Sequence, residues 1–279
     1  MAIVLVMAGA ATLASAAPPA AAGNNSFLAL GDSVVFGYIE QAGYAYVNPN
    51  NFIGYPDYVG GELRLDTADA ACPGETTSSF SSSTGADNGC RPFRSNFPLH
   101  VAYTSTQLDF ATTFLANHRQ TRLVTIGLGA NDVFLLQDSC AGDIGCIETG
   151  LPAVLTTVVA NMDKILGRVR ATGFRGVLIV VNYYSLDYTD PAETGVTMAL
   201  NEALTGIARA HGAVVADAFS AFQTAASVVG GKTCITGLLN ADPQNQFLCD
   251  VHPSQSGQQL LSDTVEATYR AALVGGKGN

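Results

Sequence analysis

The chain has 279 residues, of which 48% are hydrophobic and 13% are charged, a composition typical of a globular protein with a sizeable core. Its formal net charge is −10. Such an acidic protein is a poor partner for nucleic acid, which selects basic surfaces, and for anionic membranes. The charge does not exclude brief contact with a lipid substrate.

The first residues resemble a secretory signal. Residues 1–17, MAIVLVMAGAATLASAA, combine a short apolar run with a small-residue cleavage site, although no Lys or Arg precedes the run and the true start could lie upstream of Met1. The run is too short to predict a stable membrane span. We therefore expect a signal peptide and flexible lead over 1–24, one folded domain over 25–279, and a secreted protein.

The six cysteines fit an exported chain. None forms a CxxC pair and the histidines are not spaced for zinc, so a metal site is not indicated. An even number in an exported chain favours disulfides, for which fifteen pairings are possible. The simplest scheme joins neighbours, each pair closing a local loop: Cys72–Cys90, Cys140–Cys146 and Cys234–Cys249.

Strand and helix patterns alternate along the chain. Continuous runs rich in Val, Ile and Leu predict buried strands at 27–31, 123–129, 176–184 and 213–219, with a further strand near 63–68. Helical periodicity is found at 104–118, 151–172, 194–212 and 254–273. This alternation predicts a three-layer α/β/α fold with a central, mostly parallel sheet of the flavodoxin-like kind. The cysteine-containing stretches 72–100 and 138–150 are expected to be ordered loops.

Two predicted strands end in polar turns. The segment FLALGDSVVFG, residues 27–37, ends its apolar run in Gly31, Asp32 and Ser33, and the sequence GAND follows the second strand. In open α/β sheets, sites gather at the carboxyl ends of strands. Ser33 is therefore a candidate nucleophile that needs an adjacent base. The alternative is a helix N-cap, for which Asp and Ser are both suited.

The base has four histidine candidates. His118 and His211 lie near predicted helix ends, where a surface or C-capping role is favoured, and His100 lies in an irregular loop. His252 lies in the segment CDVHPSQSG, just before the last helix, with Asp250 two residues earlier. A carboxylate that orients an imidazole is the third member of a catalytic triad.

Acyl transfer also needs donors aimed at a developing oxyanion. The backbone N–H of Ser33 is one candidate. Gly74 is a second, because a residue without a side chain lets a substrate approach the backbone, and the Asn131 amide is a third. Each of the last two has an alternative role: Gly74 follows Pro73 and could form a type II turn, and Asn131 could cap the helix that follows.

Taken together, four segments resemble the SGNH hydrolase superfamily of GDSL esterases and lipases. The segments, in the order of the family, are LALGDSVVFG, CPGETTSSF, IGLGANDVF and DVHPSQSG. The resemblance spans residues 27–273. It implies that Ser33 is the nucleophile, that its N–H acts with Gly74 and Asn131 as the oxyanion hole, and that His252 is the base. The secreted, cysteine-containing layout is similar to the exported actinobacterial-type esterases and lipases of that superfamily.

The chain departs from the family at the acid. The family commonly places an aspartate three residues before the histidine, but here that residue is Cys249 and the aspartate is Asp250. Asp250 could reach His252 by a different loop path, a main-chain carbonyl such as that of Cys249 or Leu248 could orient the imidazole and leave a Ser–His dyad, or another aspartate could approach. We favour the first. Cys249 adjoins this loop and Cys72 adjoins the glycine donor, so bridges there would stiffen two catalytic loops.

The resemblance implies a secreted serine ester hydrolase that cleaves carboxylic esters through an acyl-enzyme, with no metal or organic cofactor. Its partner would be a small-molecule or lipid ester, with no nucleic acid and no stable membrane insertion, and we expect a monomer. Alternatives on the same fold are a phospholipase, a short-chain carboxylesterase, a carbohydrate acetyl esterase and a non-catalytic binding module.

Two further features accompany these candidates. Asp32 and Asp132 each adjoin a catalytic candidate and are expected to cap or orient the turns rather than to act as an acid/base pair. The aromatic segment 50–63 could line an acyl- or ring-binding surface, or could simply pack beneath a loop.

Overall fold

The computed structural model describes residues 25–242, 244–245 and 248–275, and the predicted signal peptide and lead, 1–24, lie outside them. In the described residues a parallel sheet with the strand order β2-β1-β3-β4-β5 forms the centre of the molecule. Its strands are β1 (Ser26–Gly31), β2 (Asp66–Asp69), β3 (Thr121–Gly127), β4 (Val177–Val181) and β5 (Val214–Ala216). This is the order of a flavodoxin-like sheet, whose direction of winding reverses between β1 and β3.

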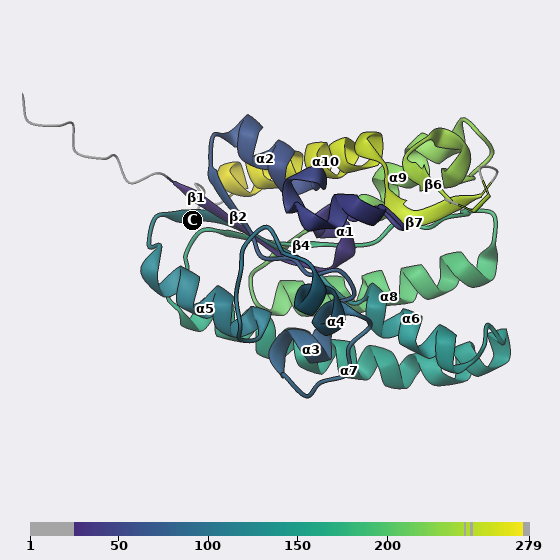
Figure 1. The fold of residues 1–279 in the computed structure, drawn as a ribbon, viewed down its shortest axis with the longest axis horizontal. Helices are drawn as coiled ribbons and strands as arrows, with labels where there is room; N and C mark the ends of the chain where they lie inside the picture. Colours follow the sequence, from purple (N-terminus) through teal and green to yellow (C-terminus); the bar gives the residue numbers. More distant parts are fainter. Residues whose placement is uncertain (1–24, 243, 246–247, 276–279) are drawn as a thin grey trace, which may run out of the picture.

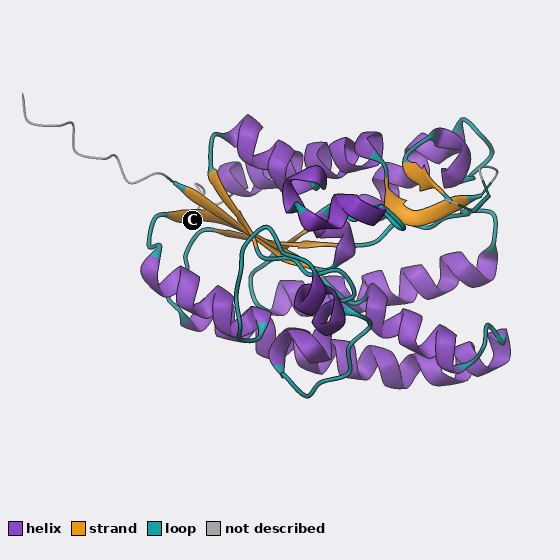
Figure 2. Cartoon of the chain, in the orientation of Figure 1, coloured by secondary structure: helices purple, strands orange, loops and turns teal. Residues whose placement is uncertain are grey.

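Helices cover both faces of the sheet, so the fold has three layers (Figures 1 and 2). One face carries α5 (Gln107–Asn117), α7 (Ile144–Ala171) and α8 (Pro191–Ala210), and the other α2 (Tyr55–Leu63), α9 (Ala218–Ser227) and α10 (Gln255–Gly275). Further helices follow strands or lie in the connections: α1 (Ser33–Phe36), α3 (Thr77–Ser81), α4 (Cys90–Asn96) and α6 (Ala130–Ser139). The predicted α/β/α class is confirmed.

The first strand shows why the sheet is buried on both sides. Leu28 and Leu30 pack with α5, α7 and α8, whereas Phe27 and Ala29 pack with α2, α9 and α10, and all four side chains are fully buried. Successive side chains of a strand point to opposite faces, so a continuous apolar run supplies both cores at once.

A small second sheet lies beside the last helix. Strands β6 (Leu239–Ala241) and β7 (Cys249–Pro253) pair antiparallel, and β7 leads directly into α10. The turns η1 (Gly43–Val47), η2 (Pro49–Asn51) and η3 (Thr233–Thr236) are short 3₁₀ helices. The six cysteines form three disulfides between chain neighbours: Cys72–Cys90, Cys140–Cys146 and Cys234–Cys249.

Helix α7 is, by length and composition alone, long and apolar enough to cross a membrane. In the described part of the chain it is the one helix with that property. Its residues Val158, Met162 and Ile165 are fully buried in the core on one face of the sheet. Of its most apolar 18-residue stretch, however, only 11% is buried within the protein, so these core contacts account for part of its apolar character.

The structure corrects the predicted extent of several elements. The stretches 72–100 and 138–150 were expected to be loops, but the first contains α3 and α4 and the second contains the end of α6 and the start of α7. Helices of five and seven residues are too short to show a periodicity. Helix α7 begins seven residues before the expected start, and Pro152, a residue typical of first turns, lies inside it. The segment 213–219 is a strand only to Ala216.

Candidate active site

The turn after β1 presents a serine at the carboxyl edge of the sheet. Gly31 has a φ of +149°, and a Cβ there would lie 2.3 Å from the carbonyl oxygen of Gly127 on β3, so the approach of the two strands requires glycine. Asp32 then caps α1 by accepting a hydrogen bond from the Val34 N–H at 3.0 Å. Ser33 occupies the first helical position, where the backbone N–H has no intrahelical partner.

A histidine and an aspartate from the other end of the chain meet this serine. His252 Nε2 lies 2.9 Å from Ser33 Oγ, and His252 Nδ1 lies 2.8 Å from each carboxylate oxygen of Asp250. Both residues belong to β7, and side chains two apart in a strand share one face. The extended backbone therefore brings Asp250 to the imidazole with a spacing of two residues, and this carboxylate is buried.

The strand that carries the histidine is held from three sides. Tyr38 packs its ring edge-on against the imidazole of His252, with 4.8 Å between ring centroids. The Tyr184 hydroxyl donates to the carbonyl of Val251 at 2.6 Å. The disulfide between Cys234 and Cys249 ties the first residue of β7 to η3. The imidazole is thus positioned by packing, by a hydrogen bond and by a covalent link.

The other three histidines lie away from this chain of hydrogen bonds. His118 is the C-cap of α5 and bonds the Phe114 carbonyl, and His211 is the C-cap of α8 and pairs with Asp163 at 2.8 Å. His100 bonds the carbonyl of Phe36 through Nε2 at 3.1 Å. These contacts are those of capping and packing residues.

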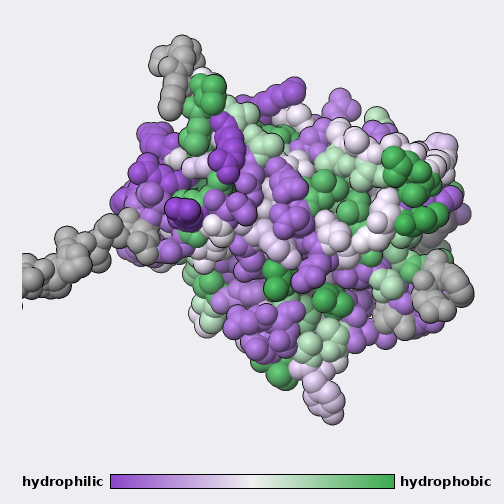
Figure 3. Space-filling model, turned by 90° about the horizontal axis from the view of Figure 1, so that it is seen from above, coloured by the Kyte–Doolittle hydropathy of each residue, from purple (hydrophilic) through white to green (hydrophobic). Residues whose placement is uncertain are grey.

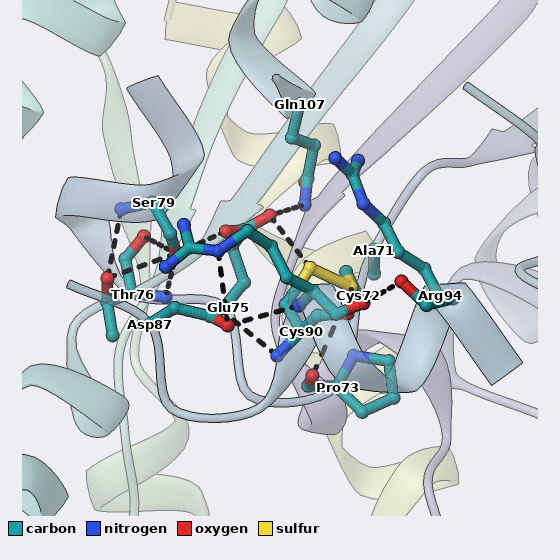
Figure 4. The surroundings of a disulfide bond; sticks show 12 residues. Ala71, Cys72, Pro73, Glu75, Thr76, Ser79, Asp87, Cys90, Arg94 and Gln107 are labelled. Atoms are coloured by element: carbon teal, nitrogen blue, oxygen red, sulfur yellow. Dashed lines mark hydrogen bonds and ion pairs between the residues drawn. A yellow bond between two sulfur atoms is a disulfide. The ribbon is translucent and has the colours of Figure 1, made fainter. Parts of the chain in front are cut away.

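Gly74 lies in a loop that a disulfide fixes in place. Its φ is +82°, and a Cβ there would lie 2.4 Å from the carbonyl oxygen of Asn88, so a side chain would disrupt the loop. The disulfide between Cys72 and Cys90 joins the start of this loop to the start of α4 (Figure 4). Two segments that are distant in sequence are thereby held beside the serine turn.

A buried carboxyl group lies next to the same disulfide (Figure 4). Glu75 accepts hydrogen bonds from the Ser79 hydroxyl and from Gln107 Nε2, the latter at 3.1 Å. Burial raises the pKa of Glu75 to about 7, against the effect of these two bonds. Glu75, Cys72 and Cys90 together offer metal-type ligand atoms, but the two sulfurs are bonded to each other and provide no thiolates.

Asn131 is the second residue of α6, and both of its amide atoms form hydrogen bonds. Its Nδ2 donates to the Glu75 carbonyl at 3.1 Å, and its Oδ1 accepts from Asn88 Nδ2 at 2.7 Å. A primary amide has two N–H donors, so a second N–H remains beyond the bond to Glu75. Asn131 lines the same two cavities as Ser33.

The two aspartates that adjoin the candidates hold turns in place. Asp32 accepts from the Tyr183 hydroxyl at 2.6 Å, and burial raises the pKa of Asp32 to about 6. Asp132 accepts from the N–H and the hydroxyl of Thr77 at 2.9 and 2.7 Å, which links the start of α6 to the start of α3. Burial raises the pKa of Asp132 as well.

Two cavities meet at Ser33 and His252. The first, of about 250 Å³, has mostly apolar walls that include Val133, Phe134, Leu186, Val196 and Leu200. The second, of about 240 Å³, has a more polar wall formed by Tyr38, Gly74, Asn88 and Phe93, among others. The serine and the imidazole thus stand between an apolar and a mixed compartment.

Three polar side chains that support the site have no sequence pattern of their own. Gln107 accepts from the Gly31 N–H at 2.6 Å and donates to the Gly31 carbonyl at 3.0 Å. Gln258 donates to the Val34 carbonyl at 2.9 Å, and Asn88 holds Asn131. The one sequence signal for Gln107 and Gln258 is the presence of a glutamine on a helix that is predicted to pack against the core.

The fold has three layers around a sheet of flavodoxin-like order, and hydrogen bonds link Ser33, His252 and Asp250 where the winding of the sheet reverses. These features define a candidate ester hydrolase of the α/β/α class. Residues 29–260 match the model of the GDSL-like Lipase/Acylhydrolase family, and the chain belongs to this family of ester hydrolases. The resemblance to SGNH and GDSL hydrolases inferred from the four segments is therefore confirmed.

Solved structures show the same fold at low sequence identity. A phospholipase A1 from Streptomyces albidoflavus NA297 has a TM-score of 0.58 and 18% identity, and the match covers 88% of this chain and 99% of that chain. An acetylxylan esterase from Geobacillus stearothermophilus has a TM-score of 0.54 and 16% identity, with coverages of 88% and 96%. A comparison with curated proteins finds no matching sequence.

Proposed function

We propose that the protein is a serine hydrolase of carboxylic esters, with Ser33 as nucleophile, His252 as general base and acid, and Asp250 as the group that orients the imidazole. The observation that carries this proposal is the continuous chain of side chains, 2.9 Å from Ser33 Oγ to His252 Nε2 and 2.8 Å from Nδ1 to Asp250. A serine hydroxyl becomes an effective nucleophile when a base is placed at this distance.

The reaction follows from these positions. Ser33 Oγ attacks the ester carbonyl carbon while His252 Nε2 takes the hydroxyl proton, and the resulting oxyanion accepts from the N–H groups of Ser33 and Gly74 and from the Asn131 amide. Collapse of this intermediate releases the alcohol, which receives the proton from His252. Water then attacks the acyl-enzyme with His252 again as base, and the carboxylic acid leaves. Asp250 stabilises the imidazolium in both halves.

The two cavities suggest how the ester lies. The apolar walls of the first cavity suit an acyl chain, since burial of each methylene contributes about 0.8 kcal/mol. At about 30 Å³ for a water-sized group, 250 Å³ holds on the order of eight such groups. The second cavity, with Tyr38 and Asn88 in its wall, suits the alcohol portion. We infer a preference for medium-length acyl esters, which favours a lipid or alkyl ester over an acetylated sugar.

We infer that the hydrolase is a secreted protein whose single domain spans 25–279 after removal of 1–24. The three disulfides support an oxidising compartment, because such bonds persist in exported proteins. The related folds include an enzyme named for phospholipids and one named for acetylated xylan. These two names do not by themselves select the class of alcohol in the ester.

The test is a series of p-nitrophenyl esters, from acetate through butyrate and octanoate to palmitate. The wild type should show its highest kcat/KM at a medium length, and Ser33→Ala should lose turnover throughout. Val196→Phe, in the wall of the first cavity, should lower the octanoate-to-butyrate ratio about tenfold or more, whereas Met198→Phe, exposed on the same helix, should not. A maximum at acetate, unchanged by Val196→Phe, would contradict the acyl assignment.

A further inference from the structure

Residues 38–53, called here the entrance segment, connect α1 to α2 and contain the two short 3₁₀ helices η1 and η2. Among its sixteen residues one is charged, Glu40. The rest are apolar, aromatic or neutral polar side chains.

The inner side of the entrance segment is a fixed aromatic cluster. Tyr46 stacks on Tyr38 and on Phe52, with ring centroids 5.6 and 5.4 Å apart, and meets Phe93 edge-on at 5.8 Å. Its hydroxyl donates to the carbonyl of Ile39 at 2.8 Å. Asn48 Oδ1 accepts from the Asn50 N–H at 3.1 Å and Asn51 Nδ2 donates to the Ala45 carbonyl at 2.9 Å, so these contacts and the aromatic cluster set the conformation of the segment.

The outer side of the entrance segment presents hydrophobic side chains to solvent. Tyr44 is 96% exposed and Val47 68%, while Ile39 and Ile53 are each 41% exposed. Tyr44 and Val47 are three residues apart in η1, and side chains at this spacing in a 3₁₀ helix lie on one side. Figure 3, which looks down on the α1 and α2 side of the molecule, shows hydrophobic groups reaching the surface between hydrophilic ones.

The entrance segment also adjoins the catalytic groups. Its first residue, Tyr38, packs against His252 and lines the second cavity together with Ser33. Anything that binds to the entrance segment would therefore lie beside the second cavity, which is assigned to the alcohol portion of the ester.

We propose that the entrance segment is a docking surface for neutral or zwitterionic lipid aggregates, with Tyr44 and Val47 entering the headgroup region. Tyrosine, with an apolar body and a polar tip, suits the membrane interface, and neutral asparagines at 48, 50 and 51 can bond headgroup oxygens. With Glu40 as its one charge, the segment has no cation to attract anionic lipid. The role of this surface in presenting substrate rests on the proposed function.

The test separates docking from turnover by using the Ser33→Ala protein. Its partition onto phosphatidylcholine vesicles is measured by co-sedimentation, alone and with Tyr44→Ser plus Val47→Ser, which should lower the partition coefficient about tenfold or more. The matched control is Val228→Ser, because Val228 is 85% exposed outside the segment. Circular dichroism melting curves should show all variants folded, since the changed side chains are exposed.

Three results would overturn the docking surface: no binding to phosphatidylcholine, equal binding by the double variant, or tighter binding to phosphatidylglycerol, which would indicate an electrostatic site elsewhere. A wild-type dimer that Tyr44→Ser plus Val47→Ser dissociates in sedimentation velocity would also overturn it, because the occupant would then be a second copy. The proposed function fails separately, if wild-type protein that binds vesicles does not hydrolyse p-nitrophenyl butyrate.

Discussion

Asn88 Nδ2 donates a hydrogen bond to Oδ1 of Asn131 at 2.7 Å. The backbone N–H of Asn88 donates to the carbonyl of Gly74 at 3.0 Å. One residue thus contacts both of the proposed oxyanion donors that lie outside the serine turn. Because Asn131 Oδ1 is occupied as an acceptor, its Nδ2 is the amide atom left to face the oxyanion.

Asn88→Asp should therefore misplace the Asn131 amide. A carboxylate of the same shape repels Oδ1 of Asn131 and attracts its Nδ2, which turns the amide away from the oxyanion. We expect kcat on a short ester to fall on the order of tenfold to a hundredfold with KM little changed, since a donor acts on the transition state. Steady-state kinetics measure both constants.

A positioning role for Asn88 has two further signatures. The ratio of variant to wild-type kcat should rise as the pH falls toward about 4, where a protonated carboxyl can again donate. In an Asn131→Ala background the same change should add little, because the residues act as one unit. Asn117→Asp, exposed on α5, is the control. A full additional loss in the Asn131→Ala background would show that Asn88 acts otherwise.

Asp250→Asn tests the acid of the proposed triad. An amide cannot stabilise the imidazolium and favours the wrong tautomer of His252, so kcat should fall on the order of 10³–10⁴. Asp263→Asn, on the exposed face of α10, serves as the matched change. Retention of more than a tenth of the activity by Asp250→Asn would favour a Ser–His dyad oriented by a main-chain carbonyl.

The disulfide beside Gly74 should affect both stability and rate. It joins residues 18 apart, and its removal as Cys72→Ala plus Cys90→Ala should cost about 3 kcal/mol of unfolding free energy and lower kcat by loosening Gly74. The bridge between Cys140 and Cys146 spans 6 residues and should cost about 2 kcal/mol with kcat retained. Equal kcat losses in the two double variants would argue against the special role of the first bridge.

Glu75 should make stability depend on pH. Its pKa is raised by burial from an ordinary 4.5 to about 7, so the stability it contributes is fully present below about 4.5 and is lost as the pH rises through 7. Glu75→Gln removes this titration. The free energy of unfolding of the variant, relative to that of the wild type, should therefore rise by on the order of 3 kcal/mol between pH 4 and pH 8. Denaturant unfolding at several pH values measures the gain, with exposed Glu62→Gln as control. If the free energies of unfolding of the wild type and Glu75→Gln change with pH in parallel, Glu75 is not the source of the pH dependence.

The sequence predicts the sheet well because its strands are buried on both faces. The run 27–31 and the run 123–129 are continuous and apolar, a pattern with few other interpretations, and both overlap observed strands. The short helices α3 and α4 have no such pattern. The predicted start of α7 is too late. Pro152 lies inside this helix, and nothing in the local sequence distinguishes a proline in a first turn from one tolerated deeper in a helix.

At the site, residues at strand ends could be predicted from the apolar pattern, Gly74 in a connecting loop was assigned with the help of the family resemblance, and Asn88 in the same connection was not predicted. Ser33 and Asn131 follow apolar runs, and the parallel sheet brings the ends of β1 and β3 together. Asn88 lies 43 residues before Asn131 in a loop placed by the disulfide and by Gly74, so its contact depends on tertiary structure alone. The spacing of Asp250 and His252 becomes interpretable only when β7 is known to be extended.

The most direct test of the account is covalent labelling of the mature protein with a fluorophosphonate, followed by peptide mass spectrometry. The account predicts rapid, stoichiometric phosphonylation of Ser33, because a hydroxyl 2.9 Å from an oriented imidazole is activated. Labelling should fall sharply in His252→Ala. An unlabelled Ser33 in folded protein, or labelling that His252→Ala leaves unchanged, would show that this serine is a turn residue and that the proposed mechanism is wrong.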